Sequence, residues 1–360
     1  MRKLLGLASL VIVVWGAGAA GQQPAFTPYG IIPVLDAYLE ALRQQAGIPG
    51  MSAALVRDGV VIWEKGYGFQ NTTARLRATP DTPYLIGDAS GTLAAVLLLQ
   101  CVEQRHLELD RPLGSYGIEL PDGNATLRQL LSHTTANSET EPFLYRPDRY
   151  EQLTAVMEHC APQPYRKSVS HRILNRLAMT DSVPGTDLRD PELALPEGLY
   201  TPIELQRYRS VLSRLAVGYK VDSRGRAERT ELAPATMSAT GGLVSTVRDL
   251  AKLDGALDAK LLLLEETLAE AWQPVPNLRG AQAQAPTGLG WFVQPYRGLR
   301  VVWHFGVVPN AYSSLIIKLP DRNLTLILLA NSDRLNTPFL LQQGDLSRSH
   351  FATLFLKLIY

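Results

Sequence analysis

The sequence predicts an α/β chain with an added all-α part: one antiparallel sheet flanked by helices, with a helical lobe inserted in the middle of the chain. Three observations predict this class. Strand patterns near the start are joined by Asp58-Gly59, strand patterns return only after residue 287, and helical patterns fill most of the region between. This order suggests one sheet assembled from both ends of the chain around a helical lobe.

The N-terminal elements are indicated by their periodicity. Residues 32–45 carry apolar side chains at helical spacing and end just before Gly47, which is typical of a helix and its stop signal. Residues 52–68 form two β-branched runs hinged at Asp58-Gly59, which predicts a hairpin. From about Asp88 the chain is apolar on nearly every helical face, so we expect a central helix in the interior.

The rest of the chain divides into a helical and a strand-rich part. Between about 110 and 237 there are short helical patterns, prolines and polar loops; four strand patterns follow, with a turn at 320–323 between the last two, and then an apolar helix at 351–360. We therefore predict an α/β part at about 30–105 and 238–360 and a helical lobe at about 106–237, all within one domain over 22–360.

The charge balance excludes some classes of partner. Lys and Arg number 35 against 34 Asp and Glu, for a net charge of +1, and no basic run follows the pattern of a phosphate-tracking surface. We therefore expect no nucleic-acid partner and no binding to anionic membranes. Any ligand is expected to be neutral or small.

The first 21 residues have the three zones of a secretory signal peptide. Arg2 and Lys3 precede an apolar stretch at 4–15 and a run of small residues at 16–21. The apolar stretch is shorter than the ~20 residues that a membrane-spanning helix needs, so export is favoured over a membrane anchor or an N-terminal buried helix. We expect a periplasmic or secreted protein, with no membrane contact beyond the signal peptide.

Two cysteines are present, and both lie in apolar helical patterns. In an exported protein Cys101 and Cys160 can pair, but two separately buried thiols fit the pattern as well. They do not form a metal-binding set, which needs more ligands at fixed spacing. No metal and no cofactor are predicted.

Eight segments, in order, resemble the β-lactamase-related family, which includes class C β-lactamases, D-Ala-D-Ala carboxypeptidases and related esterases. They lie at 48–68, 79–95, 107–116, 126–135, 172–186, 238–253, 288–293 and 304–333. The resemblance implies a β-lactamase/transpeptidase-like fold. It also implies acyl transfer by a Ser in a Ser-x-x-Lys turn at the start of the central helix, with a Tyr from the lobe, a Lys-Thr-Gly or His-x-Gly strand opposite, and backbone amides as an oxyanion hole.

The nucleophile turn departs from the family pattern. It reads Gly-Asp-Ala-Ser-Gly-Thr over 87–92, so Asp88 stands at the Ser position and Gly91 at the Lys position. Ser90 does not replace the nucleophile, because Leu93 stands where its Lys partner is needed and two residues along a helix turn the side chain by about 200°. We interpret Asp88 as an N-cap of the buried helix rather than as a reacting group.

The other two motifs are kept in part. Tyr145-Arg146-Pro147 matches Tyr-x-Asn, with Pro147 replacing the Asn and its amide donor and acceptor, and we favour a packing role for Tyr145. His304-Phe305-Gly306 matches His-x-Gly, so Gly306 keeps its place. For His304 two interpretations stay open: it binds an acidic group, Asp88 included, or it is a hydrogen-bonded wall residue.

A serine triad has no support in the sequence. His133 lies in a structural stretch of the family, and His159 and His171 lie in the lobe without a Gly-x-Ser-x-Gly elbow nearby.

The losses fall on the reacting groups, while the scaffold segments are kept, as in a pseudoenzyme. We therefore expect a non-catalytic binding or regulatory protein whose cleft, formed by Asp88, Tyr145, His304 and Gly306, holds a small molecule, a peptide or a cell-wall fragment. The alternatives are a hydrolase of esters, amides or D-Ala peptides that uses Asp88, Tyr145 and His304, and a structural scaffold. The oligomeric state stays open.

Overall fold

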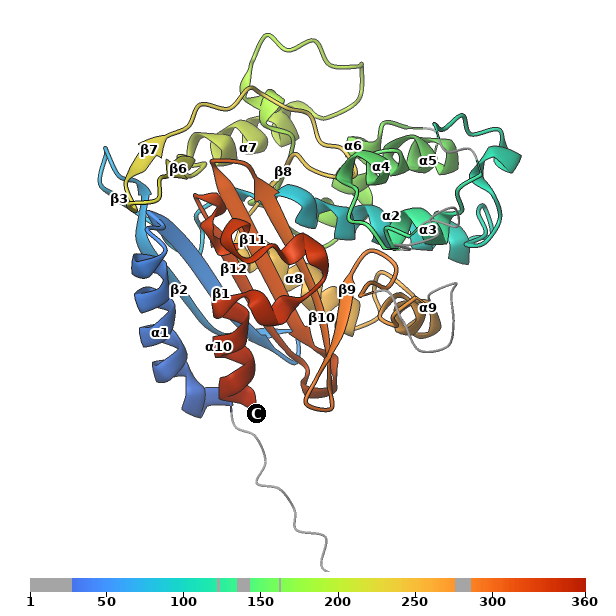
Figure 1. The fold of residues 1–360 in the computed structure, drawn as a ribbon. Coiled ribbons are helices and arrows are strands. Elements are labelled where there is room, and N and C mark those ends of the chain that lie inside the picture. The colour runs from blue at the N-terminus through green and yellow to red at the C-terminus, as the bar shows by residue number, and fades with distance from the viewer. Residues whose placement is uncertain (1–27, 122–123, 135–142, 162, 276–285) are drawn as a thin grey trace, which may run out of the picture.

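The computed structural model describes residues 28–121, 124–134, 143–161, 163–275 and 286–360 (Figure 1). Its centre is a seven-stranded sheet in the order β3-β2-β1-β12-β11-β10-β9, in which every neighbouring pair is antiparallel. Helices flank this sheet, and the helical lobe, which in the chain lies between the N-terminal and the C-terminal strands, sits to one side of it (Figure 1). The predicted fold class is confirmed.

The N-terminal half of the sheet follows the sequence pattern closely. Helix α1 spans Ile32–Gln45, and strands β1 (Gly50–Arg57) and β2 (Val60–Asn71) form the hairpin. Its turn residues, Asp58 at φ 50 and Gly59 at φ 75, are both left-handed, as a tight two-residue hairpin requires. The short strand β3 (Leu76–Arg77) pairs with β2 at the sheet edge.

The C-terminal strands complete the sheet. They are β9 (Phe292–Tyr296), β10 (Leu299–Val308), β11 (Tyr312–Leu319) and β12 (Leu324–Ala330). Strand β12 lies beside β1, with Ala54 opposite Ile327, so the two ends of the chain meet in the middle of the sheet. The predicted turn between β11 and β12 is a 3-10 turn, Pro320–Arg322, closed by Asn323 at φ 46.

Alternation along the strands gives the sheet two apolar faces. On one face α1 and the last helix, α10 (His350–Ile359), pack over Leu55, Trp303 and Leu328. On the other face lie α8 (Val247–Asp258) and the central helix α2 (Gly91–Glu103), whose residues 91–101 are all buried. The second face carries the candidate site, because the turn preceding α2 meets the sheet there.

The lobe is mostly helical, as its sequence indicates. It contains α3 (Leu127–Leu131), α4 (Pro147–Tyr150), α5 (Leu153–Cys160), α6 (Tyr165–Val169), a π-helical segment (Ser170–Asn175) and α7 (Pro202–Ser213). Three short strands join it to the main part: β4 (Tyr84–Leu85), β5 (Val183–Pro184) and β8 (Leu243–Ser245). Helix α9 (Glu265–Ala271) follows α8.

One hairpin was not predicted from the sequence. Strands β6 (Tyr219–Val221) and β7 (Ala227–Arg229) pair across a turn in which Asp222 accepts hydrogen bonds from the backbone amides of Arg224 and Arg226. Each strand has only three residues: β6 alternates between buried and exposed positions but is too short to stand out as a strand pattern, and all three residues of β7 are exposed.

Cys101 and Cys160 form a disulfide, with their α-carbons 6.4 Å apart. The alternative of two separate thiols is therefore wrong. The bond links the last turn of α2 to the end of α5, and so joins the central helix to the lobe.

The predicted signal peptide lies outside the described residues. Within the part of the chain that the structure describes, no helix combines the length and the apolar character needed to cross a membrane.

Candidate functional site

The site forms where a 3-10 turn, η2 (Gly87–Ser90), runs into α2 and touches the end of β10. Two glycines permit this contact. A β-carbon on Gly306 would lie 1.9 Å from the carbonyl oxygen of Ile86, and one on Gly87, whose φ is +58, would lie 2.6 Å from the amide nitrogen of Val307. Any larger residue at either position would therefore separate the turn from the strand.

Asp88 reaches across this contact to the strand. Its Oδ2 accepts a hydrogen bond from the backbone N–H of Val307 at 3.3 Å. Burial raises the pKa of Asp88 to about 6, and the amides of Val307 and of Asp88 itself oppose that rise. The buried carboxyl with a raised pKa is thus the side chain that stands at the nucleophile position.

The N-cap interpretation of Asp88 is wrong. Neither η2 nor α2 has a side-chain cap hydrogen bond, and Ser90 rather than Asp88 precedes α2. The helix is entered through a full 3-10 turn, which directs the carboxylate of Asp88 to the neighbouring strand instead of to the free amides of α2. A tertiary contact has taken the place of a local cap.

The same contact bears on the oxyanion hole that the resemblance implies. In that arrangement an oxyanion is held by the amide of the nucleophile residue and by an amide of the opposite strand. Here those groups are the amides of Asp88 and of Val307, the residue that follows Gly306, and both act on the Asp88 carboxylate. The protein's own side chain therefore occupies the place where a substrate oxygen would bind.

The Lys position is closed as well as empty. The hydroxyl of Tyr150 donates to the carbonyl of Gly91 at 3.0 Å, and a β-carbon on Gly91 would lie 3.0 Å from Cε1 of the tyrosine ring. Tyr150 itself is buried, 3% exposed, so it has little room to move away. The space that a lysine stem would enter is filled by an aromatic ring.

No other hydroxyl on the turn is poised for attack. The hydroxyl of Ser90 is buried and donates to the carbonyl of Gly87 at 2.8 Å. Thr92 likewise donates to the carbonyl of Ala89 at 2.8 Å. Both protons are thus held by backbone oxygens within the turn, and the rejection of Ser90 as a nucleophile agrees with this geometry.

Tyr145 lies in an aromatic cluster beside Asp88. Its ring is 4.6 Å from His133, 5.3 Å from Phe305 and 5.8 Å from Phe292, centroid to centroid. Burial raises the pKa of Tyr145 well above its ordinary value, and the negative charge of Asp88 raises it further, so the phenol keeps its proton. Two residues on, Pro147 starts α4 as its first residue, where a missing N–H costs nothing.

His304 does not pair with Asp88. Its Nδ1–H donates to the carbonyl of Phe305 at 2.7 Å, and burial lowers its pKa to about 4. The ring lines a small cavity of about 40 Å³ between α8 and β10, together with Trp272 and Trp291. Of the two interpretations, the wall residue fits this arrangement, and the imidazole is neutral at pH 7.

His133 belongs to the site, although the sequence analysis set it aside. Its Nδ1 accepts from the backbone N–H of Arg146 at 3.2 Å, and its ring stacks on Tyr150 at 4.9 Å. Burial and the nearby His304 lower its pKa to about 3. It holds the segment that carries Tyr145 against the central helix. Nothing local in the sequence marks this role, which depends on the folding of the lobe.

A carboxylate also lies at the rim near Gly91. Glu151 accepts hydrogen bonds from the hydroxyls of Ser238, at 2.8 Å, and Thr240. Between these two residues is Ala239, whose carbonyl oxygen is 3.5 Å from the β-carbon position of Gly91. Sequence reasoning missed Glu151, because no motif includes it. Among the described residues, no group of His, Cys, Asp and Glu has the arrangement of a metal site.

Comparison with known proteins gives the family. The beta-lactamase family model matches residues 35–343, and the chain belongs to this family. It is 22% identical over 280 residues to the Bacillus subtilis (strain 168) protein PbpX, whose name marks it as a candidate penicillin-binding protein; the match covers 70% of this chain and 64% of PbpX. A D-aminopeptidase of Brucella canis is 26% identical over 155 residues, 43% of this chain and 28% of that protein. The chain thus spans less than two thirds of either relative.

Solved structures show the same fold. An octameric penicillin-binding protein homologue from Pyrococcus abyssi superposes with a TM-score of 0.67 at 21% identity, over 86% of this chain and 76% of that one. A D-amino acid amidase from Ochrobactrum anthropi SV3, complexed with L-phenylalanine amide, gives a TM-score of 0.61 at 21% identity, over 83% and 91%. These likenesses support the fold alone.

Proposed function

We propose that this protein is an exported, non-catalytic member of the beta-lactamase family that binds its ligand in the Asp88 cleft without forming an acyl-enzyme. One observation carries the proposal: the Asp88 carboxylate accepts the hydrogen bond of the Val307 amide, at the position where acyl transfer needs a hydroxyl nucleophile and a free amide. A carboxylate held there repels the oxyanion that the reaction would generate.

The surrounding residues support the same conclusion. The base position is Gly91, and the ring of Tyr150 lies against it. Tyr145 keeps its proton because of burial and the charge of Asp88, so it does not act as a phenolate base at neutral pH. Nucleophile, base and oxyanion hole are thus altered together, and replacing one of them alone would not restore the reaction.

The proposed ligand is a peptide or cell-wall fragment. The names of the relatives, a candidate penicillin-binding protein and a D-aminopeptidase, support this class. The export proposed from the sequence is supported by the disulfide between Cys101 and Cys160, because such bonds persist in oxidising compartments.

A covalent probe tests the proposal. The purified protein is incubated with a fluorescent penicillin and its intact mass is measured, with a penicillin-binding protein that keeps its Ser and Lys, and therefore retains the acyl group, as the positive control. We expect no adduct on this chain and a stoichiometric one on the control. An adduct on the cleft, lost in Asp88→Asn, would overturn the proposal.

A hydrolase with altered chemistry is the alternative, and the raised pKa of Asp88 is the observation that favours it, because such shifts gather at reacting groups. Hydrolysis of a p-nitrophenyl ester and of a D-alanine p-nitroanilide distinguishes the two. We expect wild type and Asp88→Asn to show the same background rate. A wild-type rate that Asp88→Asn abolishes would establish the hydrolase instead.

A further inference from the structure

A second cavity lies on the same face of the sheet as Asp88, beside the end of β10. Its volume is about 310 Å³. In the pairing of β10 with β11, Gly306 is opposite Ser314 and Val308 is opposite Tyr312. Tyr312 lines the cavity, so β10 borders the Asp88 cleft at Gly306 and ends beside the cavity. None of the groups that surround Asp88 lines it.

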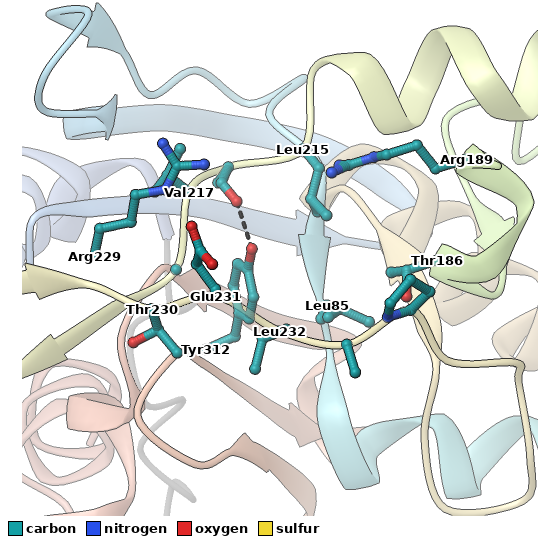
Figure 2. A pocket seen from close by; sticks show the side chains of 14 residues that line it. Leu85, Thr186, Arg189, Leu215, Val217, Arg229, Thr230, Glu231, Leu232 and Tyr312 are labelled. Carbon is teal, nitrogen blue, oxygen red and sulfur yellow. Dashed lines mark hydrogen bonds between the residues drawn. The ribbon is translucent and has the colours of Figure 1, made fainter.

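The cavity has a mixed lining, in which an apolar patch lies beside charged and hydroxyl side chains. Segments far apart in the chain contribute to the apolar patch, which includes Leu85, Leu215, Val217, Leu232 and Pro234. Tyr312 stands between them, and its hydroxyl donates to the carbonyl of Ala216 (Figure 2). A cavity of about 310 Å³ with an apolar patch next to polar groups suits a small organic molecule better than a bare inorganic ion.

Two guanidinium groups border the cavity from opposite sides. Figure 2 shows Arg189 directed toward it from one side, with Arg229 on the other side of Tyr312. Burial raises the pKa of Tyr312, and the positive charges of Arg189 and Arg229 both oppose that rise, so both lie within electrostatic reach of the phenol. The cavity therefore combines an apolar patch with a positive rim.

Among the residues that the structure describes, no carboxylate forms an ion pair with either guanidinium. Within the described ranges Arg189 donates only to the carbonyl of Leu212, at 2.8 Å, and Arg229 makes no ion pair. Arg166 differs: both of its terminal nitrogens donate to the carboxylate of Asp187, at 2.8 and 3.1 Å. The donors of Arg189 and Arg229 thus remain available, and planar guanidinium groups match carboxylates well.

Glu231 adds an acceptor to the same cavity. It lies two residues from Arg229 in the chain, lines the cavity, and forms no ion pair with either arginine. A carboxylate at this place disfavours a ligand with several negative charges. It accepts instead from an N–H group located next to a single ligand carboxylate.

We propose that this cavity binds the carboxylate of an N-acylated amino acid or of a peptide C-terminus. The carboxylate is held between Arg189 and Arg229, the amide N–H faces Glu231, and an apolar side chain rests on the apolar patch near Tyr312. This site is separate from the Asp88 cleft, and it would stand if that cleft proved catalytic.

Calorimetric titration tests the site. The probes are N-acetyl-leucine, its uncharged methylamide, N-acetyl-alanyl-leucine and inorganic phosphate, and the variants are Arg189→Gln and Arg229→Gln. The matched control is Arg224→Gln, an exposed arginine of the β6–β7 turn that does not line the cavity. Circular dichroism verifies that each variant is folded.

We expect saturable binding of N-acetyl-leucine and none of the methylamide. Each cavity variant should weaken binding about tenfold or more, as the loss of a charge-assisted hydrogen bond does, while Arg224→Gln leaves it unchanged. Tighter binding of the dipeptide assigns the site to peptide ends, and tighter binding of N-acetyl-leucine to free acyl-amino acids. The proposal is overturned if no probe binds in the millimolar range or if the methylamide binds as tightly as N-acetyl-leucine. It is also overturned if phosphate binds as tightly as N-acetyl-leucine and displaces it, because the cavity would then hold an adventitious ion only.

Discussion

The ring of Tyr150 lies beside the α-carbon of Gly91, so that a β-carbon on residue 91 would stand 3.0 Å from Cε1 of that ring. The hydroxyl of the same tyrosine donates to the Gly91 carbonyl at 3.0 Å, which fixes the ring in place. The Lys position therefore differs from that of the family in two ways: the side chain is absent, and the space it would occupy is filled. The neighbouring tyrosine has closed over the space.

Restoring the lysine should therefore destabilise the protein. Gly91→Lys forces a side chain into Tyr150 and should lower the free energy of unfolding by about 1–3 kcal/mol, as overpacking does. Urea denaturation measures this. Gly241→Lys is the matched control, because a β-carbon there meets no atom within 4 Å, and its stability should stay within about 0.5 kcal/mol of wild type. Equal stability of both variants would show that Tyr150 yields readily.

Asp88 should destabilise the folded protein above its pKa. Folding raises that pKa from 3.8 to about 6, so the folded state holds its proton longer than the unfolded state and stability falls as pH rises from about 4 to 6. Asp88→Asn removes this effect and keeps an acceptor for Val307. The variant should be about 2–3 kcal/mol more stable than wild type at pH 7.5 and equal to it near pH 4.

Urea denaturation at several pH values checks this prediction. The difference between the variant and wild type should grow with pH and level off above the folded-state pKa. An Asp88→Asn protein no more stable than wild type at pH 7.5 would show that the carboxylate is well solvated.

The two histidines of the site should stay neutral over the physiological range. Burial lowers the pKa of His304 to about 4 and that of His133 to about 3. Their ring proton resonances, assigned from His304→Gln and His133→Gln, should not move between pH 8 and pH 5.5. If either histidine titrated with a midpoint between pH 5.5 and pH 8, the prediction that burial keeps that ring neutral would be wrong.

Reduction should weaken the protein through the disulfide. The bond closes a loop with a sequence separation of 59, and removing it should lower the free energy of unfolding by about 2–4 kcal/mol. Reductant should shift the urea midpoint of wild type and leave that of Cys101→Ala/Cys160→Ala unchanged. A wild-type midpoint insensitive to reductant would mean that the two thiols add nothing to stability.

Local patterns predicted most of the sheet and its covering helices. The opening helix at 32–45 and the Asp58-Gly59 hairpin are set by apolar spacing and turn chemistry, and the structure has both. The β6–β7 hairpin was missed because β7 is exposed and the alternation of β6 extends over only three residues. Local pattern thus identifies an element when its apolar periodicity extends over enough residues, and fails for very short or exposed strands.

For the site, the sequence predicted where the residues lie but not all of the contacts they make. The resemblance placed Asp88, Gly91, Tyr145, Pro147, His304 and Gly306 in one region, and the structure brings Asp88, Tyr145 and Gly306 together there. What Asp88 does was mispredicted, because its partner is the amide of Val307, which is 219 residues away in the chain. Contacts of this kind depend on how the turn and the strand approach each other, and no local pattern records that approach.

The bond between Cys101 and Cys160 also has a topological consequence. It spans the chain between the central helix and α5, so a molecule cut at any peptide bond between the two cysteines remains one covalent molecule. Its two pieces separate only when the disulfide is reduced. In an oxidising environment, damage to this stretch by proteases would therefore leave α2 and α5 tethered to each other.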